Sequence, residues 1–186
     1  MNEVSVRVAT LADAHLLSLV ATTTFPLACP PSTTAEDIAK FCETELSPEA
    51  FTRYLKTDFY RLWLAYVDGE AQGYVMAVAG DPENPEIAQV VAMRPTVEVS
   101  KIYVHETHHG GPAAHALLDA VVEWARVSGA ASLWLGVNQL NERANRFYLR
   151  NGFAQVGARS FLVGTRWEAD FVREKVFGSR SASEPG

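Results

Sequence analysis

The sequence predicts an α/β (α+β) domain, in which strands and helices alternate along one continuous chain. Short runs rich in β-branched and aromatic residues alternate with stretches of helical periodicity. A glycine turn at residues 108–112 joins a strand that begins at Val97 directly to a helix. The chain of 186 residues shows no internal repeat and no linker. We therefore expect residues 1–177 to form one domain and the small, polar residues 178–186 to form a disordered tail.

The stretch before the glycine turn carries clear start and stop signals. Thr10 with Asp13 has the pattern of a capped helix start, Ser47-Pro48 marks another helix, and Asp68-Gly69 is a strong hairpin signal. The elements expected there are a strand at Val4–Val8, a helix from Thr10 through Val20, a loop at Phe25–Thr34, helices at Ala35–Glu45 and from Pro48 through Leu55, strands at Phe59–Val67 and Gln72–Ala79, and a long loop at Gly80–Pro95.

The remainder of the chain continues the alternation. The elements expected there are a strand at Val97–His105, a helix at Pro112–Ser128, a strand at Ser132–Val137, a helix that Asn141 caps, and closing strands at Phe153–Val156, Ser160–Val163 and Asp170–Val176. This order of elements is consistent with a sheet covered by helices.

Composition excludes several classes of protein. The net charge of −6 argues against a nucleic-acid-binding protein, which is usually basic. Cys29 and Cys42 have no metal or redox spacing, which predicts free thiols in a cytoplasmic protein. Residues Leu16–Ala28 are apolar, but no basic segment precedes them, so we expect no targeting signal. No run reaches the length expected of a transmembrane helix, so no membrane partner is expected.

The strand, glycine turn and helix around Gly110 form the sequence pattern of an anion site. The first amides of a helix have no internal partner, and the helix dipole adds positive potential there. Many α/β proteins make such a turn and bind nothing, so the turn alone does not decide whether an anion binds there. Gly-x-x-x-x-Gly-Lys-Ser/Thr and Gly-x-Gly-x-x-Gly are both missing from the sequence, which disfavours P-loop nucleotide hydrolases and dinucleotide-binding folds.

The turn resembles motif A of the GNAT superfamily of acyl-CoA N-acyltransferases, Gln/Arg-x-x-Gly-x-Gly/Ala. The six positions are His109, Gly110, Gly111, Pro112, Ala113 and Ala114. His109 replaces Gln/Arg and Pro112 replaces the central glycine. Proline suits the first helical turn but has no N–H, so the predicted phosphate cradle has one donor fewer.

A second stretch matches the GNAT motif B pattern, Asn-x-x-Ala-x-x-Phe-Tyr-x-x-x-Gly-Phe, at every defined position. These positions are Asn141, Ala144, Phe147, Tyr148, Gly152 and Phe153. The same residues also fit an ordinary amphipathic helix, with an N-cap at the first and a terminating glycine at the fifth. Their joint occurrence is what identifies the motif.

The order of elements also resembles the GNAT layout over nearly the whole chain. This implies a central, mixed but mostly antiparallel, twisted sheet of about seven strands with helices on both faces. Residues at Trp134–Val137, Phe161, Gly164, Asp170 and Lys175, together with Glu98 before Ile102–Val104, resemble the PaiA-type branch of bacterial acetyltransferases, which is associated with polyamines. Glu168-Ala169 departs from the Gln-Thr of that branch.

The resemblance implies an enzyme that transfers the acetyl group of acetyl-CoA to a primary amine by direct attack in a ternary complex. Ile102, Tyr103, Val104 and Asn141 would contact the pantetheine arm, and His109–Ala114 the diphosphate. Tyr148 would also contact the cofactor and protonate the departing thiolate. Glu98 would be the general base, or alternatively a strand-edge charge or a salt-bridge partner.

The acceptor is open at this point. A polyamine-like small amine is favoured, and a peptide or protein N-terminus or a lysine is the alternative. A function of another class is a non-catalytic acyl-CoA-binding regulatory module. No metal is expected, because His105, His108 and His109 lie in the turn without supporting ligands. A homodimer is possible, since dimers are common in the superfamily.

Overall fold

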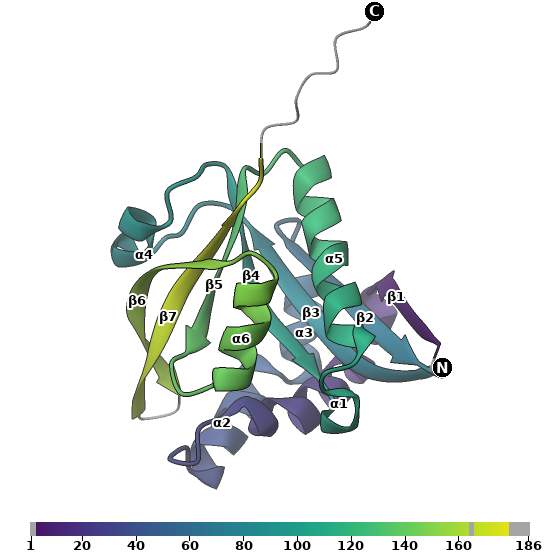
Figure 1. The fold of residues 1–186 in the computed structure, drawn as a ribbon. Coiled ribbons are helices and arrows are strands. Elements are labelled where there is room, and N and C mark those ends of the chain that lie inside the picture. Colours follow the sequence, from purple (N-terminus) through teal and green to yellow (C-terminus); the bar gives the residue numbers. More distant parts are fainter. Residues whose placement is uncertain (1–2, 164–165, 179–186) are drawn as a thin grey trace, which may run out of the picture.

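The computed structural model describes residues 3–163 and 166–178. Its elements are β1 (Val4–Val8), α1 (Ala14–Thr24), α2 (Ala35–Glu45), α3 (Pro48–Leu55), β2 (Tyr60–Val67), β3 (Glu70–Ala79), α4 (Pro85–Val90), β4 (Thr96–Val104), α5 (Pro112–Val127), β5 (Ser132–Asn138), α6 (Glu142–Arg150), β6 (Ala154–Val163) and β7 (Arg166–Val176), with short 3-10 turns η1 (Leu11–Asp13), η2 (Phe25–Ala28) and η3 (Glu106–His108). The strands form one sheet in the order β1-β2-β3-β4-β5-β7-β6 (Figure 1).

The sheet is antiparallel except where β4 meets β5. The β2–β3 hairpin turns at Asp68-Gly69, where both residues have positive φ, as the sequence predicts. The sequence-based expectation of a mixed, mostly antiparallel sheet of about seven strands is thus confirmed.

Strand β4 contains a bulge. Lys101 pairs with Met76 of β3, but Val99 pairs with the neighbouring Ala77, so Ser100 is the extra residue. Because of it, Val99 before the bulge and Ile102 after it both pack into the same core. Glu98 and Lys101, three residues apart, consequently share the other face of the sheet.

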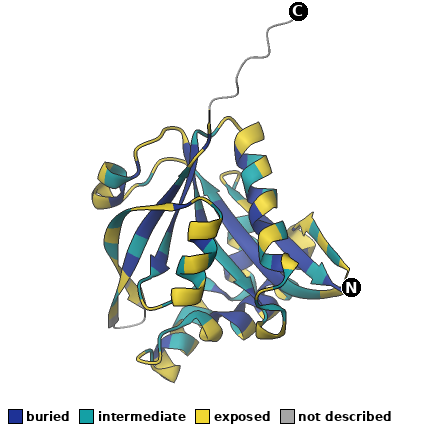
Figure 2. Ribbon diagram, in the orientation of Figure 1, coloured by how far each residue is buried: buried dark blue, intermediate teal, exposed yellow. Residues whose placement is uncertain are grey.

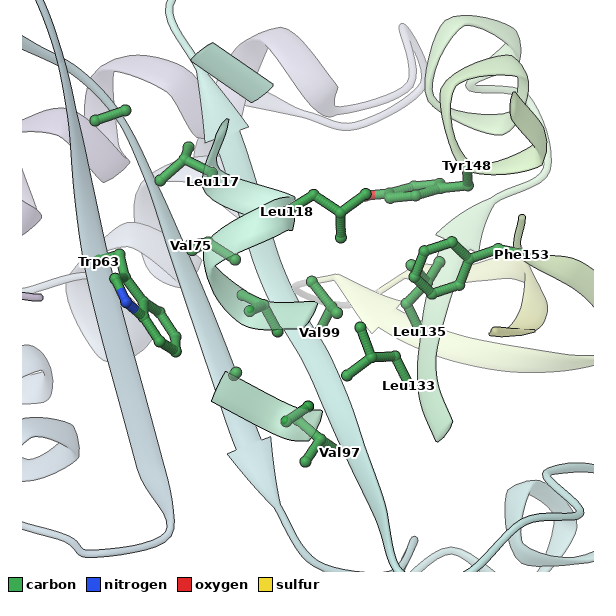
Figure 3. Packing of buried hydrophobic residues seen from close by; sticks show 14 of the residues in the cluster. Trp63, Val75, Val97, Val99, Leu117, Leu118, Leu133, Leu135, Tyr148 and Phe153 are labelled. Carbon is green, nitrogen blue, oxygen red and sulfur yellow. The ribbon is translucent and has the colours of Figure 1, made fainter. Parts of the chain in front are cut away.

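Two hydrophobic cores lie on the two faces of the sheet. One joins α5 and α6 to the strands and includes Val99, Leu117, Leu118, Tyr148 and Phe153 (Figure 3). The other joins α1, α2 and α3 to the opposite face. Figure 2 shows that the strands are buried along their centres and that the exposed residues of α5 and α6 face outwards. Helices therefore cover both faces, as the sequence predicts.

Several local predictions are wrong. The predicted loop at Gly80–Pro95 contains α4, which Asn84 caps by accepting from the amides of Glu86 and Ile87. The predicted loop at Phe25–Thr34 begins with η2. The closing strands expected at Phe153–Val156 and Ser160–Val163 are one strand, β6, because a bulge near Gly157 bends the strand without ending it. Gly164 and residues 179–186, which are the predicted tail apart from Gly178, lie outside the described residues.

One helical stretch, Leu11–Ala28, is long and apolar enough to satisfy the length and composition criteria for a membrane span. This corrects the expectation that no run reaches that length. The stretch packs some of its apolar residues, among them Leu17, Ala21 and Phe25, into the core with α3 and the sheet, while Leu11, Leu19 and Leu27 are exposed. Burial in that core accounts for part of its apolar composition.

Candidate active site

A gap between β4 and β5 defines the site. These two parallel strands pair only over Thr96–Glu98 and Ser132–Trp134. Beyond these residues β4 and β5 no longer pair, and β5 pairs on its other side with β7. The backbone groups of β4 that face β5 past Glu98 therefore have no strand partner, and unpaired strand edges readily bind extended amide-bearing chains.

A cavity of about 230 Å³ occupies this gap. Its lining includes Tyr148 and Asn141 from the α6 side and Phe25 and Cys29 from the η2 side. Because α6 and η2 belong to the cores on opposite faces of the sheet, the cavity reaches both faces through the opening between the strands.

Tyr148 enters the cavity from α6. Its side chain is 8% exposed, and its ring packs edge-on against Phe147 and Phe153 with centroid distances of 5.4 and 5.7 Å. Figure 3 shows the ring reaching from α6 towards Leu118 of α5. Burial raises the pKa of the phenol above its usual value, so the hydroxyl stays protonated at neutral pH. The packed ring thus fixes a protonated Tyr148 hydroxyl in the cavity, where it can donate a proton.

Glu98 enters the cavity from the opposite face of the sheet. Burial raises the pKa of its carboxyl, while the nearby positive charges of Arg159 and Lys101 oppose that shift. A carboxylate with a raised pKa is a better proton acceptor than an exposed one. No salt bridge to Glu98 occurs among the described residues, so the alternative of a salt-bridge partner finds no support there.

Lys101 was missed by the sequence-based predictions, although it interrupts the apolar pattern of β4. It lines the same cavity as Glu98, and its ammonium lies 6.0 Å from the centre of the Tyr54 ring. Burial lowers the pKa of the ammonium, an effect that the carboxylates of Glu98 and Glu45 counteract. The cavity therefore contains the Glu98 carboxyl with a raised pKa and the Lys101 ammonium with a lowered pKa.

A second cavity, of about 570 Å³, adjoins the first. It is lined by the ends of β2 and β3, by the segment leading into α4, and by Trp134. Glu98, Ser100 and Arg159 line both cavities, so the two meet at Glu98. Asp81 and Glu83 add two exposed carboxylates to its wall.

Arg159 and Asp170 fix the boundary between the cavities. The Arg159 guanidinium lies 3.4 Å from a carboxylate oxygen of Asp170, and its central carbon lies 5.9 Å from the Trp134 ring. Burial raises the pKa of Asp170, and Arg159 opposes the shift. Trp134 is 4% exposed, and its indole nitrogen has no hydrogen-bond partner among the described residues.

The glycine turn lies at the end of β4. Gly110 has φ +77°, and Gly111 caps α5 without a side-chain hydrogen bond. The amides of His109 and Gly111 donate to the carbonyls of Glu106 and His108 at 3.0 and 3.2 Å, so they are already used within the turn. The N–H groups of residues 113 and 114 have neither an intrahelical partner nor a side-chain cap and are available to an anion.

His109 does not direct its side chain to solvent. Its Nε2 lies 2.8 Å from the Val104 carbonyl oxygen, and its Nδ1 contacts the Arg143 guanidinium from α6. Burial lowers the pKa of the imidazole, and the positive charge of Arg143 lowers it further. The ring is thus held in its neutral form between the end of β4 and the start of α6.

The structure brings together five of the twelve residues predicted for the site. Glu98, Ile102, Tyr103, Asn141 and Tyr148 all line the cavity between β4 and β5. Val104 and the turn at 109–114 lie outside its lining, immediately beyond it along the chain. The side-chain oxygen of Asn141 accepts from the Ala144 amide at 3.0 Å, so this residue also caps α6.

Within residues 3–163 and 166–178, no three His, Cys, Asp or Glu side chains are grouped closely enough to hold a metal ion. His105 contacts the Thr107 hydroxyl, and His109 is bonded as described above. The expectation of a metal-free site stays a prediction.

Comparison with known proteins decides the family. The sequence model of the Acetyltransferase (GNAT) family matches residues 30–153. The chain belongs to the GNAT family of acetyltransferases. An uncharacterized N-acetyltransferase of Mycobacterium tuberculosis is 41% identical over 162 residues, which cover 87% of this chain and 96% of that protein.

Solved structures of GNAT proteins share the fold. The PaiA N-acetyltransferase of Thermoplasma acidophilum, in complex with coenzyme A, matches with a TM-score of 0.75 at 16% identity, covering 94% of this chain and 99% of that one. NAA60 of Arabidopsis thaliana, in complex with a bisubstrate analogue, matches with a TM-score of 0.70 at 19% identity, covering 94% and 98%. The GNAT fold predicted from motifs A and B is therefore confirmed.

Proposed function

We propose that this GNAT acetyltransferase transfers the acetyl group of acetyl-CoA to a primary amine of a small molecule, by direct attack in a ternary complex. One observation carries the proposal. The cavity between β4 and β5 is lined by a buried phenol, Tyr148, from one face of the sheet and by a partly buried carboxyl, Glu98, from the other. Such a pair suits a reaction that takes a proton from one reactant and gives one to a leaving group.

The residues present fit coenzyme A. The edge of β4 that has no strand partner, from Ser100 to Tyr103, can pair with the amides of a pantetheine arm lying in the gap. Asn141 stands beside that gap at the start of α6. The uncapped amides at the start of α5 suit a diphosphate, although Pro112 supplies no donor.

The chemistry follows from these positions. An alkyl amine has an ordinary pKa of about 10.4 and attacks only when neutral. Glu98 accepts its proton, directly or through a water molecule. A backbone N–H of β4 stabilises the negative charge that develops on the thioester oxygen. Tyr148 donates a proton to the departing thiolate.

The second cavity supports a cationic acceptor. Its wall carries the carboxylates of Glu83 and Glu98, that of Asp81, which pairs with Arg94 at 3.4 Å, and the aromatic rings of Phe59 and Tyr60, whose centres lie 4.9 Å apart. Carboxylates and aromatic faces both attract ammonium groups. A polyamine-like amine is therefore the favoured acceptor, and a peptide or protein N-terminus or a lysine is the alternative.

An assay of thiol release from acetyl-CoA tests the proposal. Spermidine-like polyamines, arylamines, free amino acids and short peptides are offered as acceptors at equal concentration. Turnover that is highest with polyamines supports the full proposal, and preference for peptides replaces the acceptor class. Binding of CoA with no turnover on any amine would instead identify a non-catalytic acyl-CoA-binding module.

Location and assembly are part of the same proposal. Cys29 and Cys42 are both free thiols, which suits the reducing cytoplasm, and relatives that are 41% identical come from Mycobacterium. A homodimer remains a proposal that rests on the family resemblance. Light scattering coupled to size-exclusion chromatography would give a mass near 41 kDa for a dimer of the 20.4 kDa chain.

A further inference from the structure

Two departures from motif A leave the phosphate cradle of this chain short of donors. His109 stands where the motif has Gln or Arg, and Pro112 removes a backbone N–H. The amides of His109 and Gly111 are also occupied within the turn. If the proposed function holds, the two negative charges of the CoA diphosphate need a cation from elsewhere in the chain, and the inference below rests on that function.

The hydrogen bonds of His109 determine its protonation state and its tautomer. The Val104 carbonyl can only accept, so Nε2 carries the proton and donates across 2.8 Å. A guanidinium can only donate, so Nδ1 is unprotonated and accepts from Arg143. Both contacts require neutral imidazole, which agrees with the lowered pKa of His109. The ring thus connects a fixed carbonyl of β4 to a side chain of α6.

Arg143 is the cation that this connection positions. It lines the cavity between β4 and β5 and also a neighbouring cavity of about 250 Å³ that is bounded by Cys29 and Asn138. Among the described residues no carboxylate forms an ion pair with Arg143, and only one of its nitrogens is bonded, to His109. Arg146, one turn further along α6, differs because it pairs with Glu142 at 3.1 Å.

We infer that Arg143, positioned by neutral His109, binds the diphosphate of CoA. A guanidinium presents its N–H groups in a planar fork that matches phosphate oxygens, and the charge strengthens each bond. The contact replaces what the motif A side chain and the N–H of residue 112 would supply. His109 acts through Arg143 and is a positioning residue, while Arg143 touches the ligand itself.

Calorimetric titration of the full chain with three ligands tests the inference. CoA carries the diphosphate and a 3′-phosphate, dephospho-CoA carries only the diphosphate, and pantetheine carries neither. In Arg143→Gln we expect the Kd for CoA and for dephospho-CoA to rise about 10- to 100-fold, as for loss of a charged hydrogen bond. Affinity for pantetheine should stay within a factor of two of wild type.

Arg146→Gln is the matched control, because it removes the same charge from the same helix outside both cavities. It should change none of the three affinities by more than about twofold. The inference is overturned if Arg143→Gln binds CoA as wild type does, or if its loss also appears with pantetheine. It is likewise overturned if the loss disappears with dephospho-CoA, which would assign Arg143 to the 3′-phosphate.

A double-mutant cycle distinguishes a role of His109 in positioning Arg143 from a purely structural role of His109. His109→Leu should weaken CoA binding as long as Arg143 is present, because the leucine side chain cannot accept from the guanidinium. In the double variant with Arg143→Gln, His109→Leu should cost nothing further. Fully additive losses would contradict the positioning role. Wild-type protein that fails to bind CoA would refute the proposed function itself, whereas normal binding by Arg143→Gln refutes only this inference.

Discussion

Replacing Glu98 by glutamine removes the proposed base while keeping the size and shape of the side chain. General-base catalysis contributes about 10²- to 10⁴-fold to a rate. The lower end applies here, because Glu98 faces a cavity in which water can take over part of the proton transfer. We therefore expect kcat to fall about 100-fold, which corresponds to about 2.7 kcal/mol in activation free energy. Affinity for CoA should not change.

The pH dependence of kcat provides a second test of the role of Glu98. Burial raises the pKa of Glu98 above its ordinary value of 4.5, so wild-type kcat should fall on the acid side through that raised pKa. In Glu98→Gln this acid limb should be missing. An acid limb that persists unchanged in the variant would assign it to another group, such as Asp170, whose pKa is raised as well.

Glu98→Gln should raise the free energy of unfolding at neutral pH although it lowers kcat. A carboxyl whose folded-state pKa is raised binds its proton more tightly when folded, so it lowers the free energy of unfolding as pH rises through that pKa. Glu98→Gln should therefore be more stable than wild type at pH 7 and not at pH 4, as measured by urea denaturation. Glu86→Gln, an exposed acid on α4, is the control. A glutamine variant that keeps full kcat would refute the assignment of Glu98 as base.

Three further variants test other parts of the structure. Tyr148→Phe should lower kcat about 100-fold with CoA affinity and urea midpoint unchanged, because the packed ring is kept. Asp13→Asn should lower the free energy of unfolding by about 2 kcal/mol, because it breaks a two-bond ion pair with Arg7 at 2.7 and 2.8 Å. Glu174→Gln should cost about 2 kcal/mol in urea denaturation, because the buried carboxylate accepts from Ser132 and two backbone amides before β4.

Each of these variants has a result that would contradict the reasoning. Loss of CoA affinity in Tyr148→Phe would make the hydroxyl a binding group. Arg7 lowers the pKa of Asp13 below its ordinary 3.8, so the stability it contributes is present at pH 7 and is lost as pH falls through the lowered value. A deficit of Asp13→Asn that stays constant down to pH 2 would refute the ion-pair explanation. A Glu174→Gln variant as stable as wild type would show that the loop before β4 is held by other contacts.

Elements with local start signals were predictable from the sequence. Helix α2 has the predicted bounds, because the Thr34 hydroxyl accepts from the Asp37 amide and ends the loop there. Helix α3 begins where Ser47 caps it, by accepting from Ala50. These signals act within one turn of the chain, so they do not depend on the rest of the fold.

Features that depend on distant partners were not predictable. Helix α4 has six residues, too few for a periodic pattern to show. The bulge at Ser100 exists only through the register of β4 against β3, yet it places Glu98 and Lys101 on one face. Tyr148 and Asn141, which the motifs single out, both line the cavity. Nothing local to the turn could reveal that His109 bonds to Arg143, which lies 34 residues away in the chain.

The most direct test of the account is a crystal structure of the protein with CoA. We predict that the pantetheine arm lies in the gap between β4 and β5, with its thiol within hydrogen-bond distance of the Tyr148 hydroxyl. The diphosphate should contact the free amides at the start of α5. CoA bound outside this gap, or a thiol remote from Tyr148 while the gap stays empty, would contradict the account.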